Sequence, residues 1–442
     1  MDIYYILNHD NSDNNIFDFE NNSDTIDIGK NYKKCNGQGQ MLPPPTLITP
    51  SNQNDTITYY TDGRSISVPR KMLIDPNTIV DCGTNGIMFI AFNFETQKRV
   101  ILKKLSKRMF DNELNGHRII RNLIFQNLFQ GGKHISTYQS IFKRKCSDSY
   151  QPPLTSILNS IISSNDNPQQ HSTLIQQKDD EDFYFESIQP QYSLLNLISN
   201  NMLDQDDICQ LFYEILMGLK FMHSAGVIHR DLDPENSIFV DENFNIKFTE
   251  FNNCFLLDTD PTFLFNKEYI TNTYSYRAPE TIWGDSLYTE ATDVWGAGVL
   301  FAELLLGKRL FRSFNSKEHL KSIYKLIGAP KASEGAYVVK GELLFFLMEY
   351  NRKNSFQPTF NNTFIGCNQI QIDLLKNMLC WDPRDRYSVN EILESPYFEN
   401  IHDRTNFIPC DKNLNVNIHF DILNLKPNQM TNLIDQEFLN PS

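Results

Sequence analysis

The segment from His229 to Asn236 places an acid and an amide at a spacing that suits phosphoryl transfer. It reads HRDLDPEN, with Asp231 and Asn236 five residues apart in one loop between two hydrophobic runs. An aspartate can accept the proton of an attacking hydroxyl group, and an asparagine can hold a metal ion that bridges phosphate oxygens. Asp231 is therefore a candidate catalytic base, and Asn236 is a candidate metal ligand.

The composition is that of a soluble globular protein with an acidic balance. The 442 residues allow a two-lobed domain with appendages, and 40% hydrophobic residues can form a large core. The net charge of −14 argues against nucleic acid and anionic membranes as partners. The eight cysteines form no C-x-x-C pair, which argues against a zinc site or a disulfide framework and favours a reducing compartment.

The sequence predicts no targeting or membrane-spanning segment. The first residues, MDIYYILNHD, contain neither a basic stretch nor a long apolar run. The most apolar run, residues 294–307, is too short to span a bilayer and contains Glu303, so we expect it to be a buried helix. These features predict a protein of the cytoplasm or the nucleus.

Residues 78–105 predict three strands joined by tight turns. They are rich in β-branched residues, and Gly83 and Gly86 mark a hairpin. Lys103 lies in the third strand, in the run VILK. A single lysine in a strand is usually solvated, but VILK resembles the V-A-I-K strand of the protein kinases, and this resemblance implies a phosphate-binding role.

Helical periodicity appears in two segments that flank this chemistry. Residues 111–130 have apolar positions at helical spacing, and residues 205–226 are strongly amphipathic and end at a glycine. After the HRDLDPEN loop, Phe239-Val240 and Ile246-Lys247-Phe248 predict a short hairpin.

The order of these motifs resembles that of the eukaryotic protein kinases over about residues 75–400. HRD-x-x-x-x-N is followed by APE at residues 278–280, by D-x-W-x-x-G from Asp293, and by Arg386. Segments such as RVILKKLSKRMF and HSAGVIHRDL are similar to the mitogen-activated protein kinases. The resemblance implies an α+β bilobal kinase fold, with a small β-rich N-lobe containing one main helix and a large helical C-lobe. It also implies that Arg386 pairs with Glu280.

The resemblance divides the chain into three regions. Residues 1–70 are rich in asparagine and lack periodicity, which predicts a disordered arm. The kinase domain spans 71–400, and residues 401–442 are expected to form an extension that packs back on the lobes. Within the domain the N-lobe covers 71–190, including a polar and flexible insertion at 143–181, and the C-lobe covers 191–400.

The family's site residues carry over to matching positions. In the family the glycine hairpin lies over ATP, the strand lysine holds its phosphates, and magnesium binds the loop asparagine and the acid of a following DFG motif. The resemblance implies Asp231 and Lys103 as catalytic residues and Asn236 and Glu250 as metal ligands. The cofactor-binding positions are Val80, Gly83, Gly86, Met88 and Lys103.

Several of these positions depart from the family pattern. The DFG motif reads Glu250-Phe251-Asn252, and the extra methylene of Glu250 moves the oxygens that magnesium requires in near-ideal octahedral geometry. Asn122 replaces the helix glutamate that pairs with the strand lysine. Asp233 replaces a lysine beside the transferred phosphoryl group. Ile101 replaces the alanine above the adenine ring, and such overpacking costs about 1–3 kcal/mol.

Further departures affect the supporting residues. Asp81 replaces the first glycine of the hairpin, and Gln126 replaces an apolar residue expected to stack against Phe251. Lys267 replaces the phosphorylated threonine of the activation segment. The arginines that bind the activation-segment phosphate in the family match Arg118, Arg121 and Arg230, so an anion pocket is one expectation and structural cations are the other.

Two functions follow from this pattern. The first is a MAP-kinase-like pseudokinase, a monomer that binds other signalling proteins as a scaffold or regulator, with weak or absent binding of ATP and magnesium. The alternative is an active ATP-dependent Ser/Thr protein kinase with altered metal coordination. In that case Asp231 is the base, Lys103 holds phosphates, and Asn236 and Glu250 hold metal.

Overall fold

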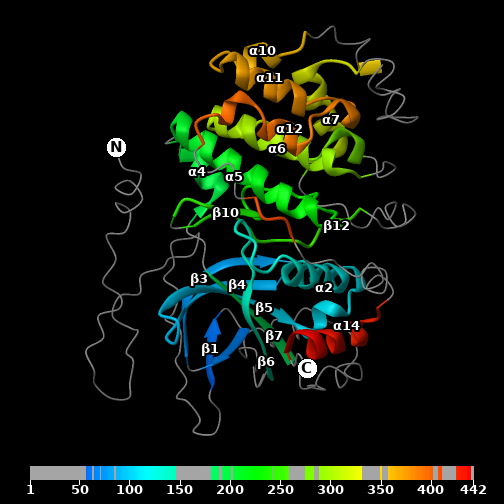
Figure 1. Cartoon of the computed structure of the whole chain (residues 1–442). Coiled ribbons are helices and arrows are strands. Elements are labelled where there is room, and N and C mark those ends of the chain that lie inside the picture. The colour runs from blue at the N-terminus through cyan, green and yellow to red at the C-terminus, as the bar shows by residue number, and fades with distance from the viewer. Residues whose placement is uncertain are drawn as a thin grey trace, which may run out of the picture.

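The computed structural model describes most of the domain and part of its C-terminal extension. The described ranges are 56–61, 64–69, 71–83, 86–145, 181–188, 192–200, 203–241, 243–257, 274–282, 288–330, 349–350, 357–401, 407–410 and 425–439. A β-rich lobe and a helical lobe lie one above the other (Figure 1). This arrangement confirms the predicted fold class.

The small lobe is built on a five-stranded antiparallel sheet with the strand order β3-β4-β5-β7-β6. The strands are β3 (Met72–Gly83), β4 (Gly86–Asn93), β5 (Lys98–Ser106), β6 (Tyr138–Lys145) and β7 (Glu181–Ile188). The first three are the strands predicted over residues 78–105. Lys103 lies opposite Met88 on β4 and opposite Phe185 on β7, near the centre of the sheet.

The N-terminal boundary of the ordered lobe corrects the prediction that the arm extends to residue 70. Strands β1 (Thr56–Thr61) and β2 (Arg64–Pro69) form an antiparallel hairpin. Ile66 and Val68 on β2 are almost fully buried. Their alternation with polar neighbours is a strand pattern that the polar composition of the longer arm obscured. The rest of the arm lies outside the described residues.

The predicted insertion also begins later than expected. Strand β6 extends to Lys145, so residues 143–145 belong to the sheet, where they pair with residues 181–183 of β7. This polar KRK run stays in the strand because it pairs with β7, in which Asp182 and Phe183 are buried. The remainder of the insertion, residues 146–180, lies outside the described residues.

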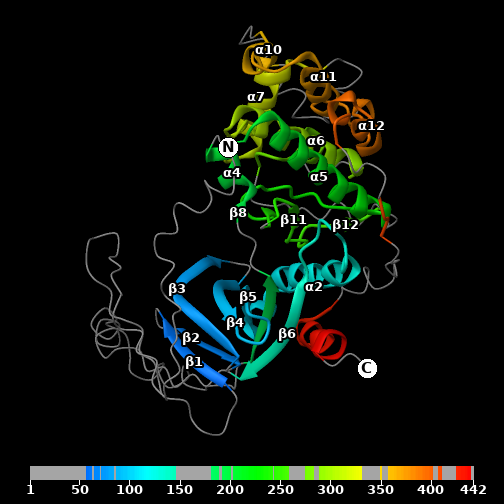
Figure 2. The same cartoon turned by 60° about the vertical axis from the view of Figure 1, so that its left-hand side comes forward.

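Helix α2 (Glu113–Leu128) covers one face of the sheet, and the C-terminal helix α14 (Pro427–Ile434) packs against it (Figure 2). Met430 and Ile434 are fully buried in the same apolar cluster as Ile120 of α2. The α2 backbone can approach the Met430 sulfur because residue 116 is glycine, and a Cβ there would fall inside van der Waals contact. The ion pairs Lys426–Glu113 (3.0 Å) and Lys143–Asp435 (3.0 Å) flank this contact.

Truncation of Met430 tests how much the C-terminal helix stabilises the small lobe. We expect Met430→Ala to lower the free energy of unfolding by about 2–4 kcal/mol, because it leaves a cavity at a fully buried site. Asn428→Ala, at an exposed position of the same helix, should change it by less than about 0.5 kcal/mol. Urea denaturation measures both values. Equal and small effects would mean that α14 does not stabilise the lobe.

The large lobe is built around helices α5 (Gln205–Ser224) and α6 (Glu290–Leu306). Phe212 of α5 stacks on Phe301 of α6 with ring centroids 4.2 Å apart. The run expected to be a buried helix is α6, which ends at Gly307 in a left-handed conformation. The other helices are α4 (Leu194–Asn200), α7 (Ser316–Ile327), α10 (Phe360–Thr363), α11 (Gln369–Met378) and α12 (Val389–Leu393). None of the helices in the described ranges has the length and apolar character needed to cross a membrane.

Short strands hold the HRDLDPEN loop between the lobes. It follows β9 (Val227–Ile228) and leads into the predicted hairpin of β10 (Ile238–Val240) and β11 (Ile246–Phe248). Strands β8 (Tyr192–Ser193) and β12 (Phe255–Leu256) pair with β10 and β9 respectively. The expected ion pair of Arg386 with Glu280 is also present, with two hydrogen bonds of 2.7 Å.

Candidate phosphoryl-transfer site

The HRDLDPEN loop is held in place by the buried carboxylate of Asp293 at the start of α6. Its two oxygens accept hydrogen bonds from the backbone N–H groups of His229 and Arg230, both at 2.8 Å. Arg230 has a φ of 66°, which is unusual for a residue with a side chain and is maintained by these contacts. The His229 ring is buried beside Phe248 and Phe251. Asp293 is therefore a structural residue that fixes the backbone of this loop.

The two aspartates of this loop each accept a hydrogen bond from an asparagine. Asn253 Nδ2 donates to Asp231 Oδ2 at 2.8 Å, and Asn236 Nδ2 donates to Asp233 Oδ2 at 2.9 Å. Burial, and next the negative charge of Asp233, raise the pKa of Asp231 to about 7. This pKa is in the range that general base catalysis at neutral pH requires, and the role of Asp231 as a base stays a prediction. The amide of Asn253, however, already occupies one of its oxygens.

Lys103 forms an ion pair with Glu250, the residue at the DFG aspartate position. The Nζ–Oε1 distance is 2.8 Å, and the two side chains are 6% and 19% exposed. The second oxygen of Glu250 accepts a hydrogen bond of 2.6 Å from Asn252 Nδ2. Both oxygens of this predicted metal ligand therefore accept hydrogen bonds from side chains of the protein itself.

Asn122 takes a different partner from the glutamate that it replaces. Its Oδ1 accepts a hydrogen bond from the backbone N–H of Phe251 at 2.8 Å, and its Nδ2 donates to the Tyr138 hydroxyl at 3.0 Å. Asn122, Lys103, Tyr138 and Asn252 line the same small cavity behind β5. The residue that should position Lys103 instead holds the backbone of the Glu250-Phe251-Asn252 segment.

Two further side chains of α2 bind the same segment. Gln126 Nε2 donates to the Thr249 carbonyl oxygen at 2.9 Å, and Arg121 Nη1 donates to the Asn252 carbonyl oxygen at 3.2 Å. Phe129, rather than Gln126, packs against the Phe251 ring, with centroids 5.4 Å apart. Three side chains of α2, those of Arg121, Asn122 and Gln126, thus bind the backbone of residues 249–252.

The fold itself requires one glycine of the hairpin, Gly86. Gly83 pairs with Gly86 across the turn, and Gly86 has a φ of 103°. A Cβ at Gly86 would meet the backbone carbonyl of Lys104, so the close approach of β5 already requires glycine there. Of the other predicted nucleotide-binding residues, Met88 is half-buried and pairs with Lys103 across β4 and β5. The side chain of Val80 is not among those that the structure describes.

Ile101 stands on the strand face that also presents Lys103. It is half-buried and lies opposite Ile90 on β4 and Ser187 on β7, whereas its neighbours Val100 and Leu102 are almost fully buried in the core. Two residues along a strand share one face, so Ile101 and Lys103 both point toward the cleft. The place above the adenine ring that the resemblance implies for Ile101 stays a prediction.

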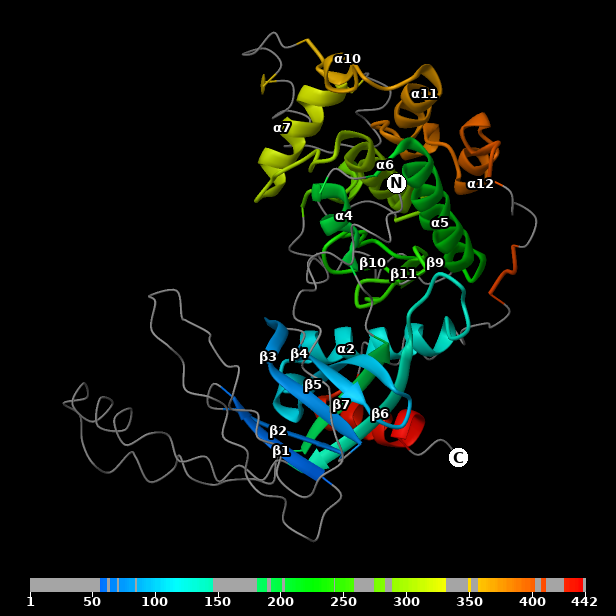
Figure 3. The ribbon, with the colours of Figure 1, turned by 90° about the vertical axis from the view of Figure 1, so that its left-hand side faces the viewer.

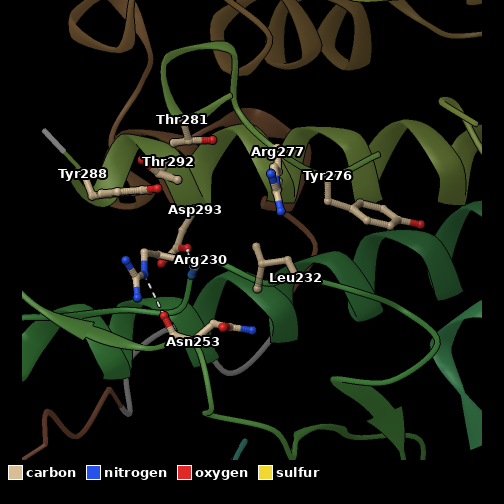
Figure 4. Close-up of a pocket in the computed structure, with 10 residues that line it drawn as sticks. Arg230, Leu232, Asn253, Tyr276, Arg277, Thr281, Tyr288, Thr292 and Asp293 are labelled. Atoms are coloured by element: carbon tan, nitrogen blue, oxygen red, sulfur yellow. Dashed lines mark hydrogen bonds between the residues drawn. The ribbon is translucent and has the colours of Figure 1, made fainter. Parts of the chain in front are cut away.

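Two of the three arginines of the expected anion pocket bind main-chain carbonyl groups, whereas Nε of the third, Arg118, is buried without a hydrogen-bond partner. Arg121 donates to Asn252, as described above, and Arg230 Nε donates to the Asn253 carbonyl oxygen at 2.6 Å (Figure 4). The Arg230 guanidinium also lies 4.9 Å from the centroid of the Tyr288 ring. It borders a cavity of about 30 Å³, which is also lined by Arg277, Thr281 and Thr292. The activation-segment residues 267–269 lie outside the described residues.

Sequence reasoning missed the asparagines at positions 252 and 253. The motif comparison identifies Asn252 only as part of the altered DFG motif and gives Asn253 no role. Both donate to carboxylates of the site. The sequence contained a signal for this role, because asparagines stand close to acids in both motifs. An asparagine amide can donate a hydrogen bond to a carboxylate. In the described part of the chain no cluster of three or more histidine, cysteine or acidic side chains could hold a metal ion.

The fold and the loop geometry define the class of protein, and comparison with known sequences agrees. The family model for the protein kinase domain matches residues 77–398, so the chain belongs to the protein kinase family. Such a domain implies ATP and magnesium as cofactors.

Three proteins of Dictyostelium discoideum illustrate the range of its relatives. A probable serine/threonine-protein kinase kinase is 42% identical over 91% of this chain and 85% of its own length. A probable inactive serine/threonine-protein kinase is 32% identical over 90% of this chain and 96% of its own length. Extracellular signal-regulated kinase 1 is 31% identical over 90% of this chain and 68% of its own length. The domain is therefore similar to MAP kinases and has relatives named as kinases and as an inactive kinase.

Proposed function

We propose that this protein is a MAP-kinase-like pseudokinase that binds other signalling proteins as a scaffold or regulator and binds ATP weakly or not at all. The observation that carries the proposal is the Lys103–Glu250 ion pair, completed by the amide of Asn252. In this cleft the charges that would hold phosphates and metal neutralise each other.

The predicted metal ligands, Glu250 and Asn236, are not arranged to bind magnesium in this structure. Magnesium requires oxygen ligands in near-octahedral geometry. Both oxygens of Glu250 accept from Lys103 and Asn252, and the side chain of Asn236 is oriented by its bond to Asp233. Magnesium binding would require Glu250 to release these donors and the Lys103 ammonium to find another partner. The bond from Asn236 to Asp233 uses Asn236 Nδ2 and not the Oδ1 that would bind metal.

A nucleotide would meet the same difficulty at its phosphates. Lys103 could contact them only by sharing or leaving Glu250, and Asn122 cannot supply the missing negative charge on α2. Asp233 adds an acid where the family has a lysine. A unit charge at about 4 Å contributes roughly 4 kcal/mol at an effective dielectric constant of about 20, and exposure to water reduces this value. The sign opposes a triphosphate.

A binding role also suits the contacts between α2 and the Glu250 segment. Active kinases move these two elements between states, and this movement depends on a few contacts that form and break. Here Asn122, Gln126 and Arg121 all bind the backbone of residues 249–252. A cleft held in one arrangement by its own side chains presents a constant surface to partners.

The alternative, an active Ser/Thr kinase with altered metal coordination, is favoured by one observation. Lys103, Asp231 and Asn236 are all retained, and the raised pKa of Asp231, about 7, suits a general base. In that reaction Asp231 would accept the proton of a substrate hydroxyl group after releasing Asn253.

A thermal-shift titration separates the two functions. A ligand present at about 100 times its Kd adds roughly 2.7 kcal/mol of stability, which raises the Tm by several degrees. We expect millimolar ATP with magnesium to leave the Tm unchanged. A saturable rise in Tm, together with autophosphorylation that is lost in Asp231→Asn, would overturn the proposal. Asn253→Ala is the variant to compare with Asp231→Asn, because it removes the amide that binds Asp231 and leaves every charge in place.

A further inference from the structure

The C-terminal segment supplies part of the apolar core of the small lobe. Helix α14 lies against α2 and against the 3-10 turn Lys107–Phe110, and the residues that follow it, Asp435–Leu439, lie beside β6 (red in Figure 3). The surface that receives α14, which we call the tail-binding surface, is formed by Phe110, Gly116, Ile120 and Phe183. The small lobe therefore buries this surface with a segment from the far end of the chain.

Two apolar side chains anchor α14 to the tail-binding surface. Met430 and Ile434 are four residues apart, so they lie on one face of the helix, and both are 0% exposed. Asn428 and Asn432 of the same helix are exposed. Gly116 admits the Met430 side chain, because a Cβ at that position would meet its sulfur. The surface thus recognises an amphipathic helix by a pair of anchors one turn apart, which is a common mode of helix binding.

Opposite charges at both ends fix the direction of the bound helix. Lys426 Nζ lies 3.0 Å from Glu113 Oε1 before the first anchor, and Asp435 Oδ2 lies 3.0 Å from Lys143 Nζ after the second. These side chains are partly exposed, so the pairs add little affinity, but the reversed orientation would place like charges together. The preferred ligand therefore carries a basic residue four positions before its first anchor and an acid directly after its second.

Helix α14 is held by tertiary contacts rather than by its own stability. It has eight residues, whereas an isolated helix needs about 12–15 residues to be even marginally stable in water. Docking also orders residues 425–439, and the entropy that they lose opposes the gain from the two anchors. A longer helix that is already formed loses less entropy when it binds. Such a helix can therefore replace α14 at the same surface.

The tail-binding surface is expected to keep its shape without α14, because its parts have other contacts. Arg121, Asn122 and Gln126 hold α2 through the backbone of residues 249–252. Phe110 lies edge-on to Phe183 of β7, with ring centroids 5.8 Å apart. A preformed surface costs little free energy to bind, and its apolar side chains favour any helix that removes them from water.

We propose that an amphipathic helix of a partner protein binds the tail-binding surface by replacing α14. The sequence pattern of the partner helix is the one that α14 displays: a basic residue, an apolar anchor four positions later, a second anchor after four more, and then an acid. The surface lies outside the candidate phosphoryl-transfer site. The proposal therefore does not depend on whether the chain binds ATP.

The test asks whether a helix binds this surface when it is not part of the chain. The probe is a fluorescein-labelled peptide with the sequence of residues 425–439, LKPNQMTNLIDQEFL, and its binding to the full chain is followed by fluorescence anisotropy. The released variant, Met430→Asp/Ile434→Asp, places charges at the two buried anchors and so detaches α14. We expect it to bind the peptide at least about tenfold more tightly than the wild-type chain, in which α14 competes.

The wild-type chain should still reach saturation at a higher peptide concentration, because α14 is replaceable. Failure to saturate would contradict the proposal. The Met430→Ala/Ile434→Ala peptide should bind the released variant at least about tenfold more weakly than the unchanged peptide, since it lacks both anchors.

The matched control is Asn428→Asp/Asn432→Asp, which introduces the same two charges at exposed positions of α14. It should bind the peptide as the wild-type chain does, within about twofold, because substitutions at exposed positions have small effects. In the released variant, Glu113→Lys should weaken binding severalfold, and the Lys426→Glu peptide should recover it, because the ion pair is then reversed. Glu113 is exposed, so this charge reversal leaves the fold intact.

Gly116→Leu in the released variant should abolish peptide binding, because the leucine side chain takes the place of Met430. Binding that survives this change in a variant with wild-type circular dichroism would place the peptide elsewhere and overturn the proposal. Equal peptide affinities of the wild-type chain and the released variant would do the same. A wild-type dimer in analytical ultracentrifugation that is lost in the released variant would instead assign the surface to α14 of a second copy. No nucleotide is present, so failure here is distinguishable from failure of the pseudokinase proposal.

Discussion

Lys103→Met is expected to lower the free energy of unfolding by about 2–3 kcal/mol, because it leaves the Glu250 carboxylate without its counter-charge. Breaking a buried ion pair from one side typically costs about 3–5 kcal/mol. The 19% exposure of Glu250 places the expected value below that range. In a kinase that uses this lysine for ATP, its loss would mainly affect nucleotide binding, so a loss of stability in the free protein marks a structural role.

A double-mutant cycle makes this expectation specific. Glu250→Gln alone should also destabilise the protein, because it leaves the Lys103 ammonium buried without an acid. The double variant Lys103→Met/Glu250→Gln should be more stable than the sum of the single effects predicts, by about 1–2 kcal/mol. Urea denaturation at neutral pH measures all three variants. Additive effects would show that the two side chains do not interact.

The neighbouring residue supplies a matched control. Lys104 forms an ion pair of 2.7 Å with Asp182 on β7, and both side chains are about as buried as Lys103. This pair lies on the opposite face of β5. If Lys104→Met and Lys103→Met cause similar losses, Lys103 behaves as a structural residue of the sheet. If only Lys104→Met destabilises the protein, Lys103 retains its phosphate-binding role.

Arg386→Leu is expected to cause the largest loss, about 3–5 kcal/mol, because Glu280 is then left as a buried charge without a partner. The guanidinium makes two hydrogen bonds of 2.7 Å to Glu280, and the two side chains are 0% and 2% exposed. Arg386 also donates to the carbonyl oxygens of Ala291 and Trp381. This contact joins the segment that follows the activation region to α6 and to the C-terminal part of the lobe.

The comparison for Arg386 is an arginine two residues earlier. Arg384 pairs with Asp382, but its side chain is 59% exposed, so Arg384→Leu should cost less than about 1 kcal/mol. Replacing both Arg386 and Glu280 by leucine should restore part of the stability, since no unpaired charge remains. Chemical denaturation with circular dichroism measures these values. Similar losses for Arg384→Leu and Arg386→Leu would contradict the assignment of the buried pair as a main support of the large lobe.

Much of the fold was predictable because its signals are local. The helical periodicity of residues 111–130, the glycine hairpin at Gly83 and Gly86, and the hairpin after the HRDLDPEN loop are present in short stretches of sequence, and the structure contains each of them. Strand β2 was missed although its alternation is also local, because the polar composition of the longer arm obscured a run of six residues. The motif order also predicted the Arg386–Glu280 pair, since the resemblance specified both residues.

The amino-acid sequence by itself determined which groups of the cleft were altered: Glu250, Asn122, Asp233 and Ile101 stand where the family has other residues. Only the tertiary structure decided what the altered groups do. Lys103 and Glu250 are 147 residues apart, and Asn122 and Phe251 are 129 residues apart. A carboxylate can accept a hydrogen bond from any donor that the fold brings within about 3 Å, so its partner depends on how distant segments pack rather than on spacing along the chain.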